Sequence, residues 1–431
     1  MTETTGTQPA MRRERLGELL AGRGKLVADY LSAVTGSAGR LIFALVYFVV
    51  LANTLTIAEF GVFATASAAG VMLSRLLAFG FVSPLYRAAT TRPALIGTFT
   101  AGFMLLGALS VPMIAVAGWG VHAVFFGTTL TPVLFFSVVA AEALLWRPAE
   151  VVVIVNNGIG RFGRGAIIVI LGTAIRTAAA LAFMFGPDHD LATWCGYYLV
   201  ANAASLAIAA TCFYPRQRLR LRPRVYVGRL ADSAYVALAE VLFYLQMEFD
   251  KLLVLAFGGP HLAGIYAIIM RLVDLTAIPV RTFTMMLVQH IMRIPAAIER
   301  GVVRGGIEVG VFLVSTAGLL AFVAFLSQFP TALGANVAEA APLLALAIFV
   351  PGIRNLIEYQ AELLFARGQT LIRVINLALL AAAKAVVLTW LLVLATDTPT
   401  FIWSLNAGFA ILYLASFLLT YSAMRMPARR F

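Results

Sequence analysis

Long apolar runs separated by short polar connectors recur along almost the whole chain. Each run is about 20 residues or longer, the length that an α-helix needs to cross the hydrocarbon core of a bilayer. This pattern predicts twelve membrane-spanning helices at residues 37–57, 60–83, 95–118, 131–156, 165–186, 191–213, 231–257, 262–290, 305–327, 341–366, 371–395 and 400–423. We therefore expect an all-α integral membrane protein.

The basic residues gather in every second connector between these runs. Arginine-containing connectors lie around residues 87–92, 161–164, 216–229, 293–304 and 367–373, and both termini are basic. The connectors between them contain no lysine or arginine. Because Lys and Arg are enriched in cytoplasmic loops of membrane proteins, we expect the basic connectors and both termini to lie in the cytoplasm.

The longest basic connector, residues 214–230, divides the predicted helices into two sets of six. The expected organisation is a cytoplasmic segment with an interfacial amphipathic helix, an N-lobe, a basic linker, a C-lobe and a basic tail, at residues 1–35, 36–213, 214–230, 231–424 and 425–431. An even number of helices in each lobe permits a parallel repeat related by a pseudo-two-fold axis. The step Phe60-Gly61-Val62-Phe63-Ala64 resembles Ala263-Gly264-Ile265-Tyr266-Ala267 at the equivalent place in the second lobe, which supports such a repeat.

Composition narrows the class of protein further. Hydrophobic residues make up 61% of the 431 positions and charged residues 12%, which lies outside the range of ordinary soluble domains. The net charge of +12 does not indicate a nucleic-acid partner, because the arginines lie in the connectors rather than on a soluble face. The spacing of Cys195 and Cys212 indicates neither a disulfide nor a metal site, and no cofactor is expected.

Two sets of short motifs carry a family resemblance. The first set runs from Gly39 through Glu59-Phe60-Gly61-Val62-Phe63 to Arg75 and Arg87. The second set runs from Asp250-Lys251-Leu252-Leu253-Val254 to Arg271-Leu272-Val273-Asp274. These stretches resemble polysaccharide and O-antigen flippases of the multidrug/oligosaccharidyl-lipid/polysaccharide (MOP) exporter superfamily. The resemblance implies a V-shaped pair of six-helix lobes around a central cavity. It also implies alternating access that moves a polyprenyl-pyrophosphate-linked glycan across a bacterial inner membrane.

The related lipid II flippases have fourteen helices, and this sequence offers no run for two further ones. The resemblance therefore favours the O-antigen or exopolysaccharide branch. A multidrug or other solute exporter of the same superfamily is an alternative, and an integral-membrane glycosyltransferase or polymerase is another. The enzyme class is disfavoured, because the connectors without basic residues are short and contain no evident acid/base pair.

Eight basic residues fall inside the predicted spans, away from their cytoplasmic ends: Arg75, Arg147, Arg176, Lys251, Arg271, Arg281, Arg354 and Lys384. A central Arg or Lys costs about 2.5–3.5 kcal/mol to insert, so each needs a partner or a wet cavity. Helical spacing predicts structural ion pairs of Arg271 with Asp274, Arg147 with Glu150 and Arg354 with Glu358. Arg75, Arg176 and Lys384 have no acid three or four positions away.

The candidate site follows from these charges. Guanidinium groups bind phosphate in bidentate fashion, so unpaired cavity cations suit a pyrophosphate. The candidate substrate-binding residues are Arg176, Arg75 and Lys384, followed by Arg40, Arg147 and Arg354. Pairing with an acid from another helix is the alternative for each. Asp250, Glu142 and Glu240 are candidates for coupling to a proton or sodium ion, because a carboxylate in low dielectric can exchange either.

Overall fold

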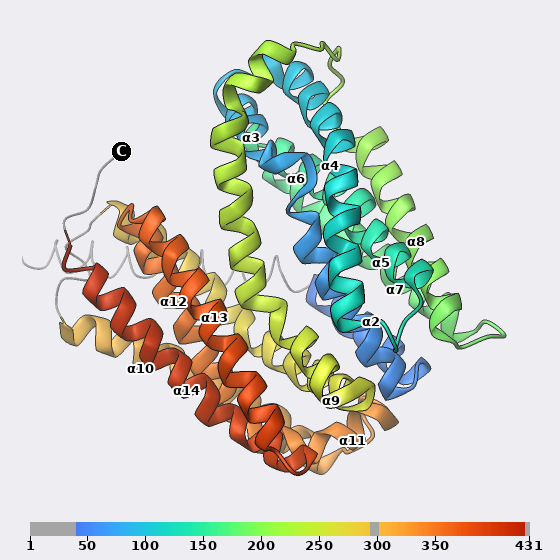
Figure 1. Ribbon diagram of the computed structural model, residues 1–431, viewed down its shortest axis with the longest axis vertical. Coiled ribbons are helices and arrows are strands. Elements are labelled where there is room, and N and C mark those ends of the chain that lie inside the picture. Colours follow the sequence, from blue (N-terminus) through green and yellow to red (C-terminus); the bar gives the residue numbers. More distant parts are fainter. Residues whose placement is uncertain (1–39, 294–300, 427–431) are drawn as a thin grey trace, which may run out of the picture.

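The computed structural model describes residues 40–293 and 301–426, and every regular element in these ranges is a helix (Figure 1). The expected interfacial helix of residues 1–35 and the end of the basic tail lie outside the described residues. The first half contains a short helix, Arg40–Thr54, followed by α2 (Ile57–Ser74), η1 (Leu77–Gly80), α3 (Val82–Thr91), η2 (Pro93–Leu95), α4 (Ile96–Phe125), α5 (Pro132–Ala140), η3 (Ala141–Trp146), α6 (Arg147–Gly158), α7 (Phe162–Met184), α8 (Leu191–Ile208) and η4 (Ala209–Phe213). The second half contains α9 (Pro223–Arg293), α10 (Gly301–Gln328), α11 (Ala335–Leu344), η6 (Ala345–Ala347), α12 (Val350–Ala366), α13 (Thr370–Leu394) and α14 (Thr398–Ala423).

Among the described helices, eight are long and apolar enough to cross a membrane. A ninth candidate is the pair Ala335–Ala347 and Val350–Ala366, which is bent by 67°. The expectation of twelve spans counts three segments differently. It includes the short helix Arg40–Thr54, it counts residues 132–158 as one span although α5, η3 and α6 are each short, and it counts α9 as two spans. The protein is thus a multi-pass membrane protein, and the number twelve stays a prediction.

The 71-residue helix α9 is folded back on itself. At Gly259 the backbone has φ 77°, in the left-handed region that glycine adopts without steric cost. The Tyr266 hydroxyl donates a hydrogen bond of 2.6 Å to the Asp250 carboxylate, although in a straight helix these residues would lie about 24 Å apart. The chain therefore reverses at Gly259, and α9 consists of a first half, residues 223–258, and a second half, residues 260–293.

Two predicted boundaries are wrong. The helix expected at 60–83 ends at Ser74, because Ala78 and Phe79 adopt φ 54° and 49°, and the Ser110 hydroxyl accepts a hydrogen bond from the Ala78 N–H. The linker expected at 214–230 is irregular only to residue 222, since helix α9 already begins at Pro223.

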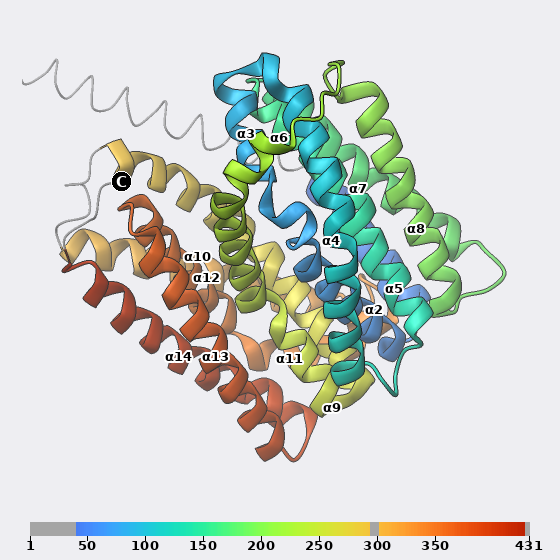
Figure 2. The same cartoon turned by 45° about the horizontal axis from the view of Figure 1, so that its top comes forward.

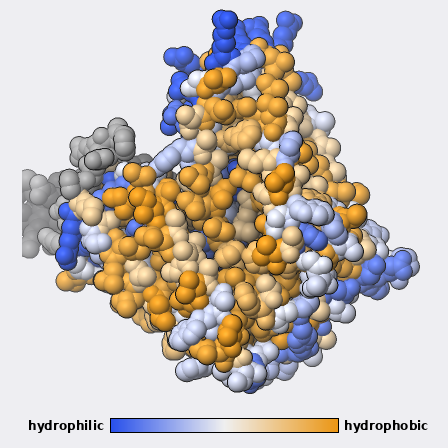
Figure 3. Space-filling view, viewed as in Figure 1, coloured by the Kyte–Doolittle hydropathy of each residue, from blue (hydrophilic) through white to orange (hydrophobic). Residues whose placement is uncertain are grey.

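The elements of the first half form one bundle, and α10 to α14 with the second half of α9 form another (Figures 1 and 2). The two bundles meet at one end and diverge toward the other, where α3 and the C-terminal end of the described chain lie. Figure 3 shows apolar side chains along the flanks of both bundles and polar side chains at their tips, the distribution expected of a surface that faces lipid.

Main-chain contacts close the end where the bundles meet. A Cβ atom added to Gly264 would lie 2.0 Å from the carbonyl oxygen of Ile57, and one added to Gly61 would lie 2.3 Å from the nitrogen of Gly264. Only glycine permits backbones to approach this closely. Beside this contact, the Asn336 side-chain amide donates to the carbonyl oxygens of Ala52 (2.6 Å) and Leu55 (2.8 Å), so α11 is fixed to the end of the first described helix.

Candidate functional site: a cationic cavity between the bundles

A cavity of about 320 Å³ lies between the two bundles. Its walls come from the helix Arg40–Thr54, α2, η3, α7, α8 and both halves of α9. The charged residues that line it are Arg40, Glu142, Arg176, Glu248, Lys251, Arg271 and Asp274. Tyrosine, tryptophan and phenylalanine side chains form much of the remaining wall: Tyr47, Phe48, Phe60, Phe63, Trp146 and Tyr198.

Arg176 of α7 is held in this cavity by aromatic and amide groups. Its guanidinium carbon lies 3.8 Å from the ring centroid of Trp146 and 5.8 Å from that of Tyr198. Its Nε donates a hydrogen bond of 3.1 Å to Asn202 Oδ1, while its buried Nη2 has no hydrogen-bond partner. No acid within the described residues forms an ion pair with Arg176, so its charge is stabilised by π-faces rather than by a carboxylate.

Glu142 lies beside Arg176 on η3, a stretch of π-helix between α5 and α6. Its carboxylate is 4% exposed and accepts hydrogen bonds from Ser67 Oγ (2.7 Å) and from the Tyr198 hydroxyl. Within the described part of the chain it has no ion-pair partner. Single π-helical turns inside α-helices are frequent at functional sites, because the extra residue turns a side chain out of register.

Arg40 and Arg271 complete the cationic face of the cavity. All three guanidinium groups line the same cavity, since Arg40, Arg176 and Arg271 all belong to its walls. Neither Arg40 nor Arg271 makes an ion pair within the residues that the structure describes. The fourth cation, Lys251, is paired with Glu248 one helical turn away.

Most of the other charges near the cavity fall into balanced ion-pair networks. In the first, the acids and bases are equal in number: Arg75, Arg147, Glu150 and Glu240. Three further sets together contain four charges of each sign: the pair Lys251–Glu248, the pair Lys384–Asp250, and the cluster of Arg281, Arg354, Asp274 and Glu358. The cavity lining as a whole carries four basic and three acidic residues, a formal excess of one positive charge, and three of its arginines make no ion pair within the described residues: Arg40, Arg176 and Arg271.

The structure divides the six candidate substrate-binding residues into two groups. Arg40 and Arg176 line the cavity. The other four belong to the balanced networks and are absent from the lining: Arg75, Arg147, Arg354 and Lys384. Lys384 lies 3.2 Å from Asp250, and both side chains are almost fully buried. In this conformation acids on neighbouring helices pair with these four residues, so their expected role in substrate binding stays a prediction.

Arg75 shows how such a partner arises. Its Nη1 donates to Glu150 at 3.1 Å, and its guanidinium lies over the ring of Tyr244 at 4.1 Å. Glu150 is on α6 and Tyr244 on the first half of α9, so three helices stabilise one charge.

The expected pairing of Arg271 with Asp274 is also corrected. Asp274 instead lies 3.3 Å from Arg281 and 3.4 Å from Arg354. Glu358, the acid that helical spacing assigned to Arg354, forms two hydrogen bonds of 2.9 Å with Arg281. The pair of Arg147 and Glu150, by contrast, has the geometry that its spacing predicts, at 2.7 Å.

The three candidates for ion coupling differ in their surroundings. Asp250 is paired with Lys384, and Glu240 lies 2.7 Å from Arg147, so both carboxylates already have a basic partner. Glu142 alone of the three lines the cavity. Trp146 was missed by the sequence analysis, although its spacing of four residues from Glu142 places both on one helix face and could have identified it.

Comparison with known proteins places this geometry in a structural class. No family profile matches the sequence, and no curated protein matches it. A multidrug-resistance MATE transporter of the MOP superfamily in its inward-facing conformation matches with a TM-score of 0.63 and 13% identity, over 90% of this chain and 94% of that one. The outward-facing conformation of such a transporter matches with a TM-score of 0.53 and 12% identity, over 90% of this chain and 93% of that one.

A third structure is a MOP superfamily transporter from Pyrococcus furiosus, whose report states that reverse polarity of the binding pocket suggests a different function. It matches with a TM-score of 0.59 and 13% identity, over 91% of this chain and 94% of that one. The chain therefore has the fold of the MATE transporters of the MOP superfamily.

Proposed function

We propose that this protein is a flippase that moves a polyprenyl-pyrophosphate-linked oligosaccharide, such as an O-antigen or exopolysaccharide unit, across a bacterial inner membrane. The observation that carries the proposal is the set of three guanidinium groups that line the cavity between the bundles without an ion-pair partner among the described residues, namely those of Arg40, Arg176 and Arg271. A pyrophosphate that links a lipid to a sugar carries two negative charges at neutral pH. Three guanidinium groups can bind its oxygens in bidentate fashion.

The unpaired buried Nη2 of Arg176 supports the same proposal. A buried donor without a partner is costly, and a phosphate oxygen is a strong acceptor. Arg176 would therefore be the principal contact, with Arg40 and Arg271 in support, in place of Arg75 and Lys384.

We further propose alternating access with the cytoplasmic side open in this conformation. The bundles diverge toward α3 and the C-terminal end, where the arginine-rich connectors lie, and these connectors are expected in the cytoplasm. In this arrangement both termini are cytoplasmic, and twelve spans form two lobes related by a pseudo-two-fold axis. The contact between Gly61 and Gly264, which occupy matching steps of the two halves, is consistent with such an axis.

Glu142 is the proposed coupling residue. It is buried beside Tyr198 and Arg176, so a proton or sodium ion on its carboxylate would change the net charge that the substrate meets. The ion and the substrate would then affect each other's binding.

Multidrug export is the second candidate function, favoured by the MATE transporters that share the fold. An excess of positive charge disfavours cationic drugs. The Pyrococcus furiosus transporter supports the view that pocket polarity differs among proteins with this fold.

The test compares Arg176→Ala and Arg176→Lys with the control Arg161→Ala, which removes an exposed arginine outside the cavity. Binding of undecaprenyl diphosphate and of ethidium to the purified protein would be measured by tryptophan fluorescence. We expect Arg176→Ala to weaken diphosphate binding at least about tenfold and Arg176→Lys to retain part of it, because lysine keeps the charge but loses the planar fork. Equal diphosphate binding by Arg176→Ala and wild type, with ethidium bound more tightly than diphosphate, would instead support multidrug export.

A further inference from the structure

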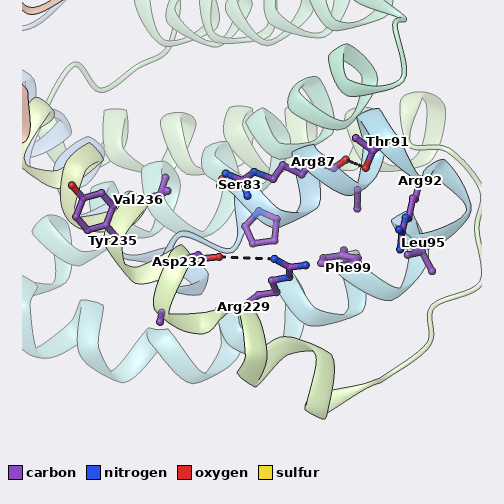
Figure 4. A pocket seen from close by; sticks show the side chains of 13 residues that line it. Ser83, Arg87, Thr91, Arg92, Leu95, Phe99, Arg229, Asp232, Tyr235 and Val236 are labelled. Atoms are coloured by element: carbon purple, nitrogen blue, oxygen red, sulfur yellow. Dashed lines mark hydrogen bonds and ion pairs between the residues drawn. The ribbon is translucent and has the colours of Figure 1, made fainter. Parts of the chain in front are cut away.

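A second basic pocket lies at the open end of the first bundle, apart from the central cavity (Figure 4). Its volume is about 810 Å³, and its walls come from α3, η2, the start of α4 and the first turns of α9. We propose that this pocket binds the phosphate-bearing headgroup of an anionic phospholipid from the cytoplasmic leaflet. This inference is independent of the function proposed for the central cavity.

The charges of the pocket are unbalanced. Arg87, Arg92 and Arg229 line it together with one acid, Asp232. Figure 4 shows Arg87 and Arg229 on facing sides of the pocket. Neither Arg87 nor Arg92 makes an ion pair within the described residues. Asp232 lies 4.0 Å from Arg229, and both side chains are more than half exposed, so this pair contributes little.

Apart from Ser83, Thr91 and Tyr235, the remaining wall is apolar, which favours a lipid over a free inorganic anion. Pro84, Ala88, Leu95, Phe99 and Val236 line the same pocket. A free phosphate would gain nothing from this surface, whereas the glycerol backbone and first methylene groups of a phospholipid would be buried against it.

Helix α3 lies where such a lipid is available. It is amphipathic: Val82, Leu85 and Ala89 are buried, whereas Tyr86 and Arg87 are exposed. An amphipathic helix with arginine on its polar face is typical of the membrane interface. The neighbouring connector carries a run of arginines, namely Arg216, Arg218, Arg220, Arg222 and Arg224. Such juxtamembrane basic segments attract anionic lipids of the cytoplasmic leaflet.

A lipid in this pocket would act on the arrangement of the bundles. The first half of α9 is docked on the first bundle here, since the Tyr226 hydroxyl donates a 2.9 Å hydrogen bond to the carbonyl oxygen of Thr98. Further along, the same half reaches the second bundle through Asp250 and Lys384. A headgroup that contacts Arg87 on α3 and Arg229 on α9 would hold α9 against the first bundle and so stabilise the conformation described here.

The test uses the purified full-length protein in a neutral detergent. Its melting temperature would be titrated with dioctanoyl phosphatidylglycerol, with dioctanoyl phosphatidylcholine and with inorganic phosphate. The variant is Arg87→Gln/Arg229→Gln, and the matched control is Arg161→Gln/Arg164→Gln, which removes the same charge from another exposed connector. Arg87→Lys/Arg229→Lys serves as a conservative variant.

We expect phosphatidylglycerol to raise the melting temperature of the wild type and of the control at similar concentrations. The Arg87→Gln/Arg229→Gln variant should need about tenfold more of this lipid or show no effect, and the lysine variant should retain most of it. Equal effects of phosphatidylcholine or inorganic phosphate on the wild type would overturn the proposal, as would an equal loss in the control. If the glutamine variant fails to fold, the wild-type lipid comparison and Arg92→Gln decide the outcome. Diphosphate binding in the central cavity should be unchanged throughout, so the two proposals can fail separately.

Discussion

The buried pair of Lys384 and Asp250 offers a quantitative test of whether a membrane cation is structural or functional. The atoms Lys384 Nζ and Asp250 Oδ2 lie 3.2 Å apart, and the side chains are 2% and 1% exposed. Lys384 also donates a 2.7 Å hydrogen bond to the Gln246 carbonyl oxygen, while Asp250 accepts one from Tyr266. At an effective dielectric constant of about 20, two charges at this separation attract by about 5 kcal/mol.

Removing either partner leaves an unpaired charge among apolar residues. We therefore expect Lys384→Met or Asp250→Asn to cost about 3–5 kcal/mol, which lowers the melting temperature of a chain of this length by roughly 3–6 °C. The double variant Lys384→Met/Asp250→Asn should recover most of the loss, because no charge remains unpaired and an asparagine oxygen can still accept from Tyr266. Melting of the detergent-solubilised protein, followed by fluorescence-detected size exclusion, measures all three.

Glu339→Gln is the control, because it disrupts an exposed contact of 3.1 Å with His261 and should change stability by less than about 0.5 kcal/mol. The reasoning fails if Lys384→Met melts within about 2 °C of the wild type. Should that variant also lose transport, Lys384 would be a substrate contact, as the sequence analysis expected.

Three further predictions concern the closed end and the topology. Gly264→Ala should force the bundles apart and reduce transport, because its Cβ would lie 2.0 Å from the Ile57 carbonyl oxygen. The control Gly310→Ala should transport like the wild type, because its Cβ would meet nothing within 4 Å. Equal transport by the two variants would contradict the importance of the Gly264 contact. Asn336→Ala removes two side-chain hydrogen bonds, worth about 1 kcal/mol each, between α11 and the end of the helix Arg40–Thr54. The distance between spin labels at the end of that helix and the start of α11 should lengthen, and an unchanged distance would contradict the role of these hydrogen bonds in holding the closed end together. A cysteine that replaces Arg220, in a background with exposed Cys212 replaced by serine, should react with an impermeant thiol reagent only after the cells are opened. Labelling of intact spheroplasts would show that this connector lies outside the cytoplasm, contrary to the expected topology.

The helices could be predicted from the sequence because a bilayer demands long apolar runs, and such runs are visible without any tertiary information. The places where these helices are interrupted could not be predicted from the sequence. Nothing in the local composition distinguishes Ala78 and Phe79 from helical residues, and their left-handed conformation depends on the Ser110 hydroxyl from α4. Likewise, the π-helical turn that carries Glu142 has no signature in the order of residues.

The candidate site was predictable only in part, for a related reason. Spacing along one helix reveals partners three or four residues apart, as for Arg147 and Glu150. Lys384 is neutralised by Asp250 on another helix, far away in the chain. Arg176 was identified correctly as a cation without a local acid, and the structure adds what the sequence could not supply, namely the aromatic faces of Trp146 and Tyr198.

The backbone contact between Gly61 and Gly264 has a consequence for how proteins with this fold can diversify. The closed end is sealed by carbonyl oxygens, amide groups and absent side chains, whereas the cavity takes its character from arginines, a glutamate and aromatic rings. Mutations that alter what is carried therefore fall on different positions from those that alter how the passage shuts. Substitution of a few cavity side chains can therefore change the ligand, while the backbone contacts that close this end remain.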